Sequence, residues 1–184
     1  MAELSYAQVS ALLKYDSETG KLYWLERPVE MFSDAFLGAE WSAKKWNTRY
    51  AGKEAFTALD SSGYHYGQIF KRPHRAHRVG WLLHTGFWPE HQIDHINGVR
   101  ADNRIVNLRD VTHAENNKNN CLRSDNYSGH PGVGWCNKRK MWRARIMELG
   151  RETHVGYFTD FDRAVQMRKK AEIDHNFHPN HGRD

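Results

Sequence analysis

A carboxylate, an imidazole and several carboxamides fall within 23 residues of this chain, between Asp94 and Asn116. The run Ile93-Asp94-His95-Ile96-Asn97-Gly98 supplies the first two groups, and Asn103 and Asn107 follow it. Asp94 offers a hard anionic oxygen and Asn116 a neutral one. This pair suits Mg²⁺ and leaves room for waters and a phosphate oxygen. A metal held there can polarise a phosphate ester and stabilise the departing 3′ oxygen.

The imidazole of His95 supplies the second half of this chemistry. An unperturbed histidine has a pKa near 6.5, so neutral imidazole is available at about pH 7 to accept a proton from an attacking water. The combination predicts metal-assisted hydrolysis of a phosphodiester. Neighbouring residues face opposite sides of a regular strand, so Asp94 and His95 share one site only if the strand twists or ends there. An isolated Asp-His pair is usually structural, and the prediction therefore depends on the whole set.

Two strands and a helix are predicted to position these groups. Residues 91–96 have a strand pattern that ends at an Asn-Gly turn signal, and residues 108–111 form a second strand pattern. Thr112 then begins a helix, and Glu115 completes a capping box with it. Positions three or four apart share one helix face, so Asn116 can turn toward the end of the first strand.

Three segments of this region together resemble HNH endonucleases of the phage and homing type: Arg75–Trp81, Ile93–Arg109 and Thr112–Asn116. The resemblance covers roughly residues 75–120 and implies a ββα-metal fold. It implies a DNA endonuclease that leaves 5′-phosphate and 3′-hydroxyl ends.

The same resemblance assigns roles to individual residues. His95 is the general base, and Asp94 and Asn116 are the ligands of one Mg²⁺ or Mn²⁺ per active site. Asn107 braces the loop between the strands and orients the base. Many HNH enzymes have histidine at the last position, whereas asparagine stands here, as in the homing-type branch. His113, one turn earlier, is the reserve ligand.

The charge of the chain favours a polyanionic partner. The formal net charge is +5 and the isoelectric point is about 9.2, although a merely basic protein would show the same values. Residues 118–151 contain eight Lys or Arg and two acids, a net charge of +6, and this concentration favours phosphate contact. The family resemblance implies that Arg78, just before the motif, contacts a phosphate of DNA; the alternative is a solvated charge on a helix.

Other sequence signals predict a soluble protein of a reducing compartment. No stretch approaches the roughly 20 apolar residues that cross a bilayer. The first residues lack the basic and apolar segments of a signal peptide. Cys121 and Cys136 make neither a disulfide framework nor a CxxC metal knuckle.

The first 74 residues contain recognisable elements but no site. Residues 5–15 have the pattern of an amphipathic helix, with Ser5 and Gln8 spaced as a capping box. Residues 21–25 and 64–70 are predicted strands, and residues 78–84 a helix that ends near Gly86. The aromatics of residues 31–55 are expected to build core: Phe32, Phe36, Trp41, Trp46 and Tyr50.

The C-terminal region has three strand patterns followed by a helix. The strands are predicted over residues 132–136, 141–149 and 153–158, and the helix over residues 161–175 with Thr159 as its N-cap. Period-two alternation divides the middle strand into two faces. The core face is Trp142, Ala144 and Ile146, and the outer face is Arg143, Arg145 and Met147.

This region resembles an AP/ERF (Apetala-type) DNA-binding domain in the order and spacing of Gly132–Trp135, Trp142–Ile146, His154–Phe158 and Ala164. Such a domain inserts a three-stranded antiparallel sheet, backed by one helix, into the major groove. The alternative is an ordinary solvated sheet face.

By strand position, the resemblance implies that Arg143, Arg145 and His154 face DNA. Lys138 and Arg139, in the first hairpin, are expected to touch the DNA backbone. Trp135 is either contact or core, with contact preferred; Trp142, Tyr157 and Phe158 are assigned to core.

The sequence therefore predicts an α+β protein that combines an HNH module with an AP/ERF-like module. The predicted domains are residues 1–74 (an α+β region and candidate extension of the DNA surface), 75–125 (the HNH module), 129–177 (the AP/ERF-like module) and a flexible tail, 178–184.

The predicted activity is metal-dependent cleavage of double-stranded DNA in the cytoplasm of a bacterial host, with no small-molecule cofactor and no membrane partner. The alternatives are a non-catalytic, sequence-specific DNA-binding regulator on a nuclease scaffold and an RNA-directed enzyme.

Overall fold

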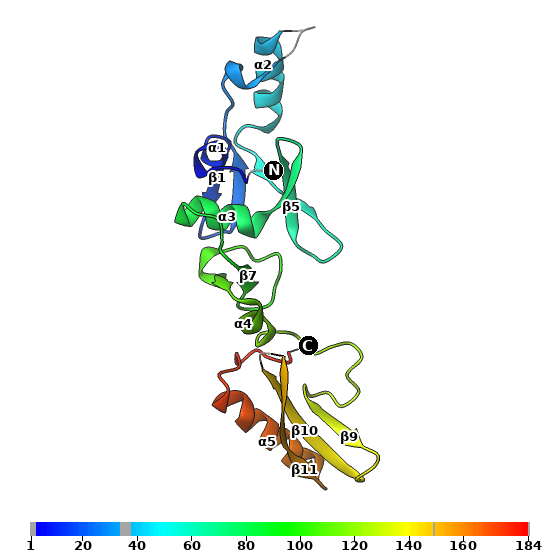
Figure 1. Ribbon diagram of the computed structural model, residues 1–184. Coiled ribbons are helices and arrows are strands. Elements are labelled where there is room, and N and C mark those ends of the chain that lie inside the picture. The colour runs from blue at the N-terminus through cyan, green and yellow to red at the C-terminus, as the bar shows by residue number, and fades with distance from the viewer. Residues whose placement is uncertain (1–2, 34–37, 149, 184) are drawn as a thin grey trace. The chain divides into compact units, whose positions relative to one another are not determined.

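The computed structural model describes residues 3–33, 38–148 and 150–183. Contacts within the chain divide it into two compact units, Met1–Asp110 and Val111–Asp184. Each unit combines short helices with small sheets, in agreement with the predicted α+β class (Figure 1). None of the helices in the described residues is long and apolar enough to cross a membrane.

The first unit begins with a helix that is shorter than the sequence predicts. Helix α1 (Tyr6–Ser10) has the predicted capping box, in which the Ser5 hydroxyl accepts from Gln8 N and the Gln8 side chain accepts from Ser5 N. The predicted extension to residue 15 is wrong. Residues beyond α1 form β1 (Leu13–Asp16), because they pair in an antiparallel hairpin with β2 (Lys21–Trp24).

The remaining elements of the first unit form a second sheet and further helices. Strand β3 (Glu54–Ala55) completes the first sheet, and the second has the order β4-β5-β6 (Ala58–Leu59, His65–Ile69, Arg72–Arg75). The helices are η1 (Val29–Met31), α2 (Ala39–Tyr50) and α3 (Ala76–Thr85). As predicted, α3 ends at Gly86, which adopts a left-handed conformation that glycine permits without strain.

The aromatics of residues 31–55 only partly form core. Trp46 packs edge-on against Trp24, with ring centroids 5.6 Å apart, and also contacts Phe32 and Tyr50. Trp41 is 45% exposed, so the core prediction is wrong there. Phe36 lies outside the described residues.

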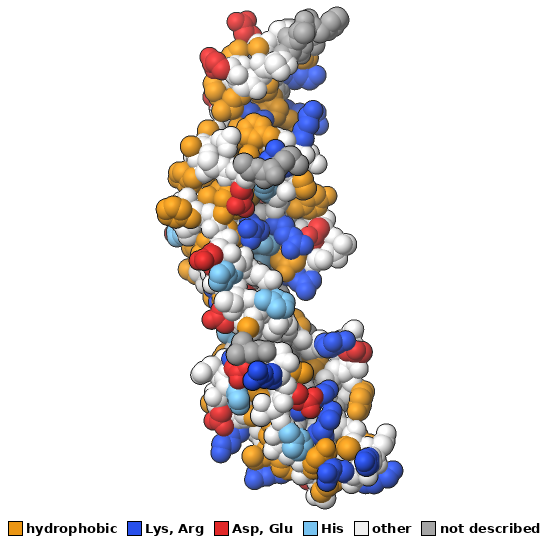
Figure 2. All heavy atoms as spheres, in the orientation of Figure 1, with side chains coloured by type: hydrophobic (Ala, Val, Ile, Leu, Met, Phe, Trp, Pro, Cys, Tyr) orange, Lys and Arg blue, Asp and Glu red, His pale blue; other side chains and the backbone are white. Residues whose placement is uncertain are grey.

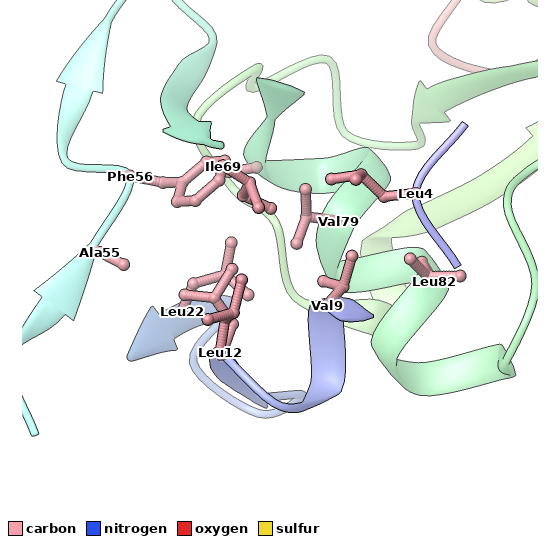
Figure 3. Close-up of a cluster of buried hydrophobic side chains, with 11 residues drawn as sticks. Leu4, Val9, Leu12, Leu22, Ala55, Phe56, Ile69, Val79 and Leu82 are labelled. Atoms are coloured by element: carbon pink, nitrogen blue, oxygen red, sulfur yellow. The ribbon is translucent and has the colours of Figure 1, made fainter. Parts of the chain in front are cut away.

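The core of the first unit lies where α1, the first sheet and α3 meet. Side chains of Leu4, Val9, Leu12 and Leu22 converge there on Val79 and Leu82 of α3 (Figure 3). Because α3 buries one face in this core, the helix is fixed relative to the first hairpin.

A buried histidine stands at the start of α3. His77 is only 4% exposed, and its ring lies 5.1 Å from those of both Tyr64 and His95. Burial is the main cause that lowers its pKa to about 3, and the nearby His95 acts in the same direction. His77 is therefore a neutral core side chain in the folded protein at neutral pH.

The segment with the predicted site chemistry forms the expected strands and helix. Strand β7 (Gln92–His95) pairs with β8 (Leu108–Val111) in a two-stranded sheet, and η2 (Ile105–Asn107) lies between them. Helix α4 (His113–Asn117) follows with the predicted capping box of Thr112 and Glu115. The division between the two units falls within β8.

The second unit contains a three-stranded antiparallel sheet of order β11-β10-β9. The strands are β9 (Val133–Cys136), β10 (Met141–Glu148) and β11 (Arg151–Phe158), and α5 (Phe161–Asp174) packs against the sheet (Figure 1). The predicted alternation is confirmed on the inner face, where Ala144 and Ile146 are fully buried. Leu149, predicted as the end of the middle strand, lies outside the described residues.

Two predictions for the C-terminal end are wrong. The N-cap of α5 is Asp160 rather than Thr159, because the Asp160 carboxylate accepts from Arg163 N at 2.7 Å. The tail predicted as flexible is held by hydrogen bonds through residue 183. Gly182 N donates to Asn120 O at 2.8 Å, and the Arg183 guanidinium donates to the Asn119 side chain at 2.8 Å.

Replacing the observed N-cap tests the first of these corrections. We expect Asp160→Ala to lower the free energy of unfolding by about 1 kcal/mol, because Arg163 N loses its acceptor. Thr159→Ala is the matched control and should change it by no more than about 0.5 kcal/mol. Denaturant titrations measure both values, and a larger loss in the Thr159 variant would contradict the assignment.

The burial of His77 predicts acid sensitivity. Its folded pKa of about 3 lies below the unfolded value near 6.5. Between these values the unfolded chain binds the additional proton, so stability falls as the pH drops from 6.5 toward 3, by up to about 1.4 kcal/mol per pH unit.

Urea titrations at about pH 7 and about pH 5 measure this loss of stability. His77→Gln should make the unfolding free energy less dependent on pH than in the original chain. His84→Gln, on the exposed side of the same helix, serves as the control and should leave the pH dependence unchanged. An equal pH dependence in the original chain and the His77 variant would contradict the explanation.

Candidate active site

Asp94 and His95 occupy the last two positions of β7, and both are buried, at 7% and 4% exposure. The strand ends at His95, whose carbonyl accepts from Gly98 N at 2.8 Å to close a turn. Gly98 has a φ of 76°, which explains the value of glycine at this position. Asp94 and His95 were expected to share one site only if the strand twists or ends at the pair, and the strand does end there.

The carboxylate of Asp94 is paired with a cation from the neighbouring strand. Arg109, on β8, donates Nε at 2.8 Å and Nη2 at 2.6 Å to Asp94 Oδ2. A buried carboxylate needs such compensation, because desolvation of an unpaired charge is costly. This partner was not predicted from the sequence. The available signal in the sequence was an arginine on the second predicted strand, next to the strand that carries Asp94 and His95.

The ring of His95 contacts a carboxamide and two other rings. Nε2 lies 3.2 Å from Asn103 Oδ1. The ring centroids of His77 and Tyr64 lie 5.1 Å and 5.7 Å from that of His95. Burial lowers the pKa of His95, while the hydrogen bond to Asn103 and the charge of Asp94 act in the opposite direction. Neutral imidazole is therefore the favoured form at neutral pH.

Asn107 holds the loop that joins β7 to β8. Its Oδ1 accepts from Asn97 N at 2.9 Å, and its Nδ2 donates to Asp102 O at 2.8 Å. Its backbone oxygen also accepts from Ile96 N at 2.9 Å. One buried carboxamide therefore ties both ends of the loop together.

Asp102 adds a second fixed point in the same loop. Its carboxylate accepts from Arg104 Nε at 2.8 Å and from Asn97 Nδ2 at 2.7 Å. The hydrogen bonds from Arg104 are the largest cause that lowers its pKa to about 2. Asp102 lies within the motif, but no role was predicted for it from the sequence.

Asn116 lies on α4, in the second unit, and is partly buried. His113, three positions earlier, is exposed and shares its helix face. No cluster of three or more His, Cys, Asp or Glu that could hold a metal occurs within residues 3–33, 38–148 and 150–183. The predicted ligands are instead one carboxylate and one carboxamide, hard oxygen donors of the kind that Mg²⁺ takes.

Arg78 is engaged with groups of the first unit. Its Nη1 donates to His91 O at 3.3 Å, and its Nη2 lies 3.9 Å from the Glu3 carboxylate. The side chain nevertheless remains 33% exposed.

The sheet of the second unit presents arginines on the face away from α5. The side chains of Arg143 and Arg145 are 37% and 45% exposed, and Met147 is 55% exposed. Glu152, on β11, lies 2.6 Å from the Arg145 guanidinium and 3.9 Å from that of Arg143. Lys and Arg side chains gather around the β9–β10 hairpin among hydrophobic ones (Figure 2).

The other predicted DNA contacts do not all lie on this face, because Trp135 pairs in register with Trp142 of the inner face. His154 pairs in register with Arg145 and is exposed. Trp135 is 39% exposed, with its ring 5.3 Å from that of Trp142. Lys138 and Arg139 are exposed in the turn between β9 and β10.

Tyr157 was predicted as core, and this prediction is wrong. Tyr157 pairs in register with Arg143, so the two side chains share the outer face. Its ring contacts His154 at 4.6 Å, and the Arg139 guanidinium lies 4.6 Å above it. Trp142 and Phe158, assigned to core with it, do pack against the inner cluster.

A groove that was not predicted from the sequence lies beside this outer face. It has a volume of about 570 Å³ and is lined by Arg123, Tyr127, Trp135, Arg143 and Arg145, among others. Tyr127 is 77% exposed, and its hydroxyl accepts from Trp135 N at 3.2 Å. The aromatic residue in the turn-rich segment before β9 was the available signal.

Comparisons with known proteins find an HNH endonuclease match over the region of the candidate site. The profile of the HNH endonuclease family matches residues 74–118, a range that includes β7, β8, α4 and the buried Asp94-His95 pair. Protein 3.8 of Escherichia phage T7 is 34% identical to this chain over 88 residues, which are 47% of this chain and 72% of that protein. No solved structure matches the chain significantly. The AP/ERF resemblance stays a prediction.

Since more than two thirds of that relative is covered at this identity, the chain belongs to the same family as Protein 3.8 of Escherichia phage T7, and its residues 74–118 are an HNH endonuclease domain.

Proposed function

We propose that this protein is a phage-type, metal-dependent endonuclease that cuts double-stranded DNA in the cytoplasm of a bacterial host. The observation that carries the proposal is the buried Asp94-His95 pair at the end of β7, within the segment matched by the HNH family. A buried carboxylate beside a neutral imidazole supplies the two groups that hydrolysis of a phosphodiester requires.

His95 acts as the general base in this proposal. Its burial favours neutral imidazole, which can accept a proton from the attacking water at neutral pH. Asn107 supports this role indirectly, because it holds the loop that follows the base. Arg78 lies on α3, and its solvent-facing part is available to contact a DNA phosphate.

Asp94 and Asn116 are the proposed ligands of one Mg²⁺ or Mn²⁺. Their donor atoms fit such an ion, because one is a carboxylate oxygen and the other a carboxamide oxygen. When bound, the ion supplies charge stabilisation to the phosphate and to the departing oxygen. Arg109 compensates the charge of Asp94, and a metal at this position must share or replace that contact.

The second unit is proposed to position the enzyme on DNA in the manner of an AP/ERF domain. Support comes from the arginines on the outer face of β10 and from the cationic β9–β10 turn. Arginine contacts DNA phosphates and guanine edges, so this face supplies affinity and orientation. His154 belongs to this proposed face, whereas Trp135, the other proposed contact, pairs with Trp142 and would reach DNA only from the exposed edge of the inner face.

A non-catalytic DNA-binding regulator is the second candidate function. The observation that favours it is the Asp94–Arg109 ion pair, which compensates the buried carboxylate from within the protein. In that case the HNH scaffold would be retained for stability, and the sheet of the second unit would carry the activity.

Plasmid cleavage distinguishes these two functions. We expect the protein to convert supercoiled plasmid to open-circular or linear forms with Mg²⁺ or Mn²⁺ and not with EDTA. His95→Ala should slow cleavage by about 10²–10⁴-fold, because the water loses its proton acceptor.

His84→Ala, an exposed histidine of the same unit, is the control for loss of an imidazole and should cleave at the original rate. Binding of the plasmid without cleavage under any metal condition would support the regulator instead. Parallel tests with single-stranded DNA and with RNA identify the substrate among nucleic acids.

The outer face of the sheet gives a separate prediction for binding. We expect Arg145→Gln to weaken DNA binding and, if the guanidinium contacts a phosphate, to reduce the slope of log affinity against log salt by about 1. Lys170→Gln, which removes one charge from the exposed side of α5, should change neither value. Fluorescence anisotropy at several salt concentrations measures both; equal effects of the two variants would contradict the proposed face.

A further inference from the structure

We propose that Asn103 is the positioning residue of the base: its carboxamide oxygen holds His95 in the Nε2–H tautomer, which leaves Nδ1 as the nitrogen that accepts the proton from water. The inference deepens the proposed function and depends on it. It begins from the 3.2 Å separation between His95 Nε2 and Asn103 Oδ1, inside a region where both side chains are 4% exposed.

The tautomer follows from the chemistry of the two groups. A neutral imidazole carries one N–H donor and one lone pair, and a carboxamide oxygen only accepts. A ring nitrogen that faces this oxygen must therefore carry the hydrogen, because two facing lone pairs in a buried site would be strongly unfavourable. The lone pair of the ring is then on Nδ1.

The same contact is compatible with both states of a general base. When Nδ1 accepts a proton, the ring becomes an imidazolium that donates from both nitrogens. The Nε2–H bond to Asn103 is kept and becomes charge-assisted, so the ring does not have to turn during proton transfer. Asn103 therefore orients the base before the reaction and stabilises the charge that forms.

The backbone of Asn103 is itself held by the first hairpin. The Tyr15 hydroxyl, on β1, donates to the backbone oxygen of Asn103 at 2.6 Å. Ile105 N donates to Ser17 O at 3.1 Å, so the loop is attached to the hairpin at two points.

Gly20 explains how closely these segments approach. Its φ is 75°, and a β-carbon added there would lie 2.5 Å from the Asn103 carbonyl carbon and from Arg104 N. Only glycine fits this position, so the first hairpin supports the backbone of Asn103 directly.

Two rings restrict His95 further. His77 stands edge-on to the His95 ring, with an interplanar angle of 90°, and Tyr64 lies on a tilted plane beside it. Rings at these distances leave little space for the imidazole to rotate about its side-chain bonds. Asn103 therefore selects the tautomer, while His77 and Tyr64 limit the orientation. Asn107, by contrast, holds the loop backbone.

The test is long-range ¹H–¹⁵N NMR of the full chain labelled at histidine, which distinguishes the two neutral tautomers by the shifts of the ring nitrogens. Signals of His95 are identified by their loss in His95→Ala. We expect the Nε2–H tautomer in the original protein, and a mixture or the opposite tautomer in Asn103→Leu, which keeps the size of the side chain and removes the acceptor. A predominant Nδ1–H form in the original protein, or an unchanged tautomer in Asn103→Leu, would overturn the proposal.

Asn103→Asp is the matched variant, because it keeps an acceptor oxygen at the same position. It should retain the hydrogen on Nε2, and because its charge also raises the pKa of His95, it should keep more of the cleavage rate than Asn103→Leu when both are assayed at alkaline pH. Asn103→Leu should lose about 10²-fold in kcat with little change in KM, as expected when a reacting group is misplaced. Equal loss of kcat in the two variants would contradict a role through the acceptor oxygen.

The tautomer measurement separates failure of this inference from failure of the proposed function. An Nε2–H tautomer that depends on Asn103, in a protein that cuts no DNA, would refute the nuclease proposal and keep the assignment of the Asn103 contact. Metal-dependent cleavage with the other tautomer would refute this inference alone. Circular dichroism shows whether Asn103→Leu is folded; if it is not, the tautomer of the original protein still decides, because a predominant Nδ1–H form would overturn the proposal.

Discussion

The site of the first unit depends on compensating the polar groups buried at the end of β7. Asp94 and His95 are almost completely removed from water, and each needs a partner at hydrogen-bonding distance. Arg109 supplies the partner of the carboxylate, and Asn103 that of the imidazole. These partners come from different segments, one from the paired strand and one from the loop. The buried pair is therefore compensated only when the strand pairing and the loop are both formed.

The loop between β7 and β8 meets this requirement through backbone contacts. Asn107 ties its two ends together, while Tyr15 fixes the carbonyl of Asn103 from the first hairpin. Because that hairpin shares a hydrophobic core with α3, the helix that carries His77 is fixed beside the ring of His95. The buried His77, which has no proposed chemical role, therefore connects the helix packed in the core with the ring of His95.

The second unit uses a simpler arrangement. Alternation along β10 places Ala144 and Ile146 against α5 and leaves Arg143 and Arg145 on the other face. The outer face is not purely cationic, since Glu152 accepts from Arg145 and lies near Arg143. A polyanion that binds there must compete with this carboxylate, and in return the pairing holds the guanidinium groups in defined positions.

The sequence by itself determined the features that local chemistry and periodicity specify. The Thr112–Glu115 capping box, the end of α3 at Gly86 and the two faces of β10 were predictable because each depends on residues a few positions apart. Only the tertiary structure decided that Arg109 contacts Asp94, that Asn103 touches the ring of His95, and that the tail after residue 177 is held by the Asn119–Leu122 segment. These contacts join residues whose separation in the chain follows no fixed period. The sequence therefore shows which side chains can form hydrogen bonds, but not which partners they bind.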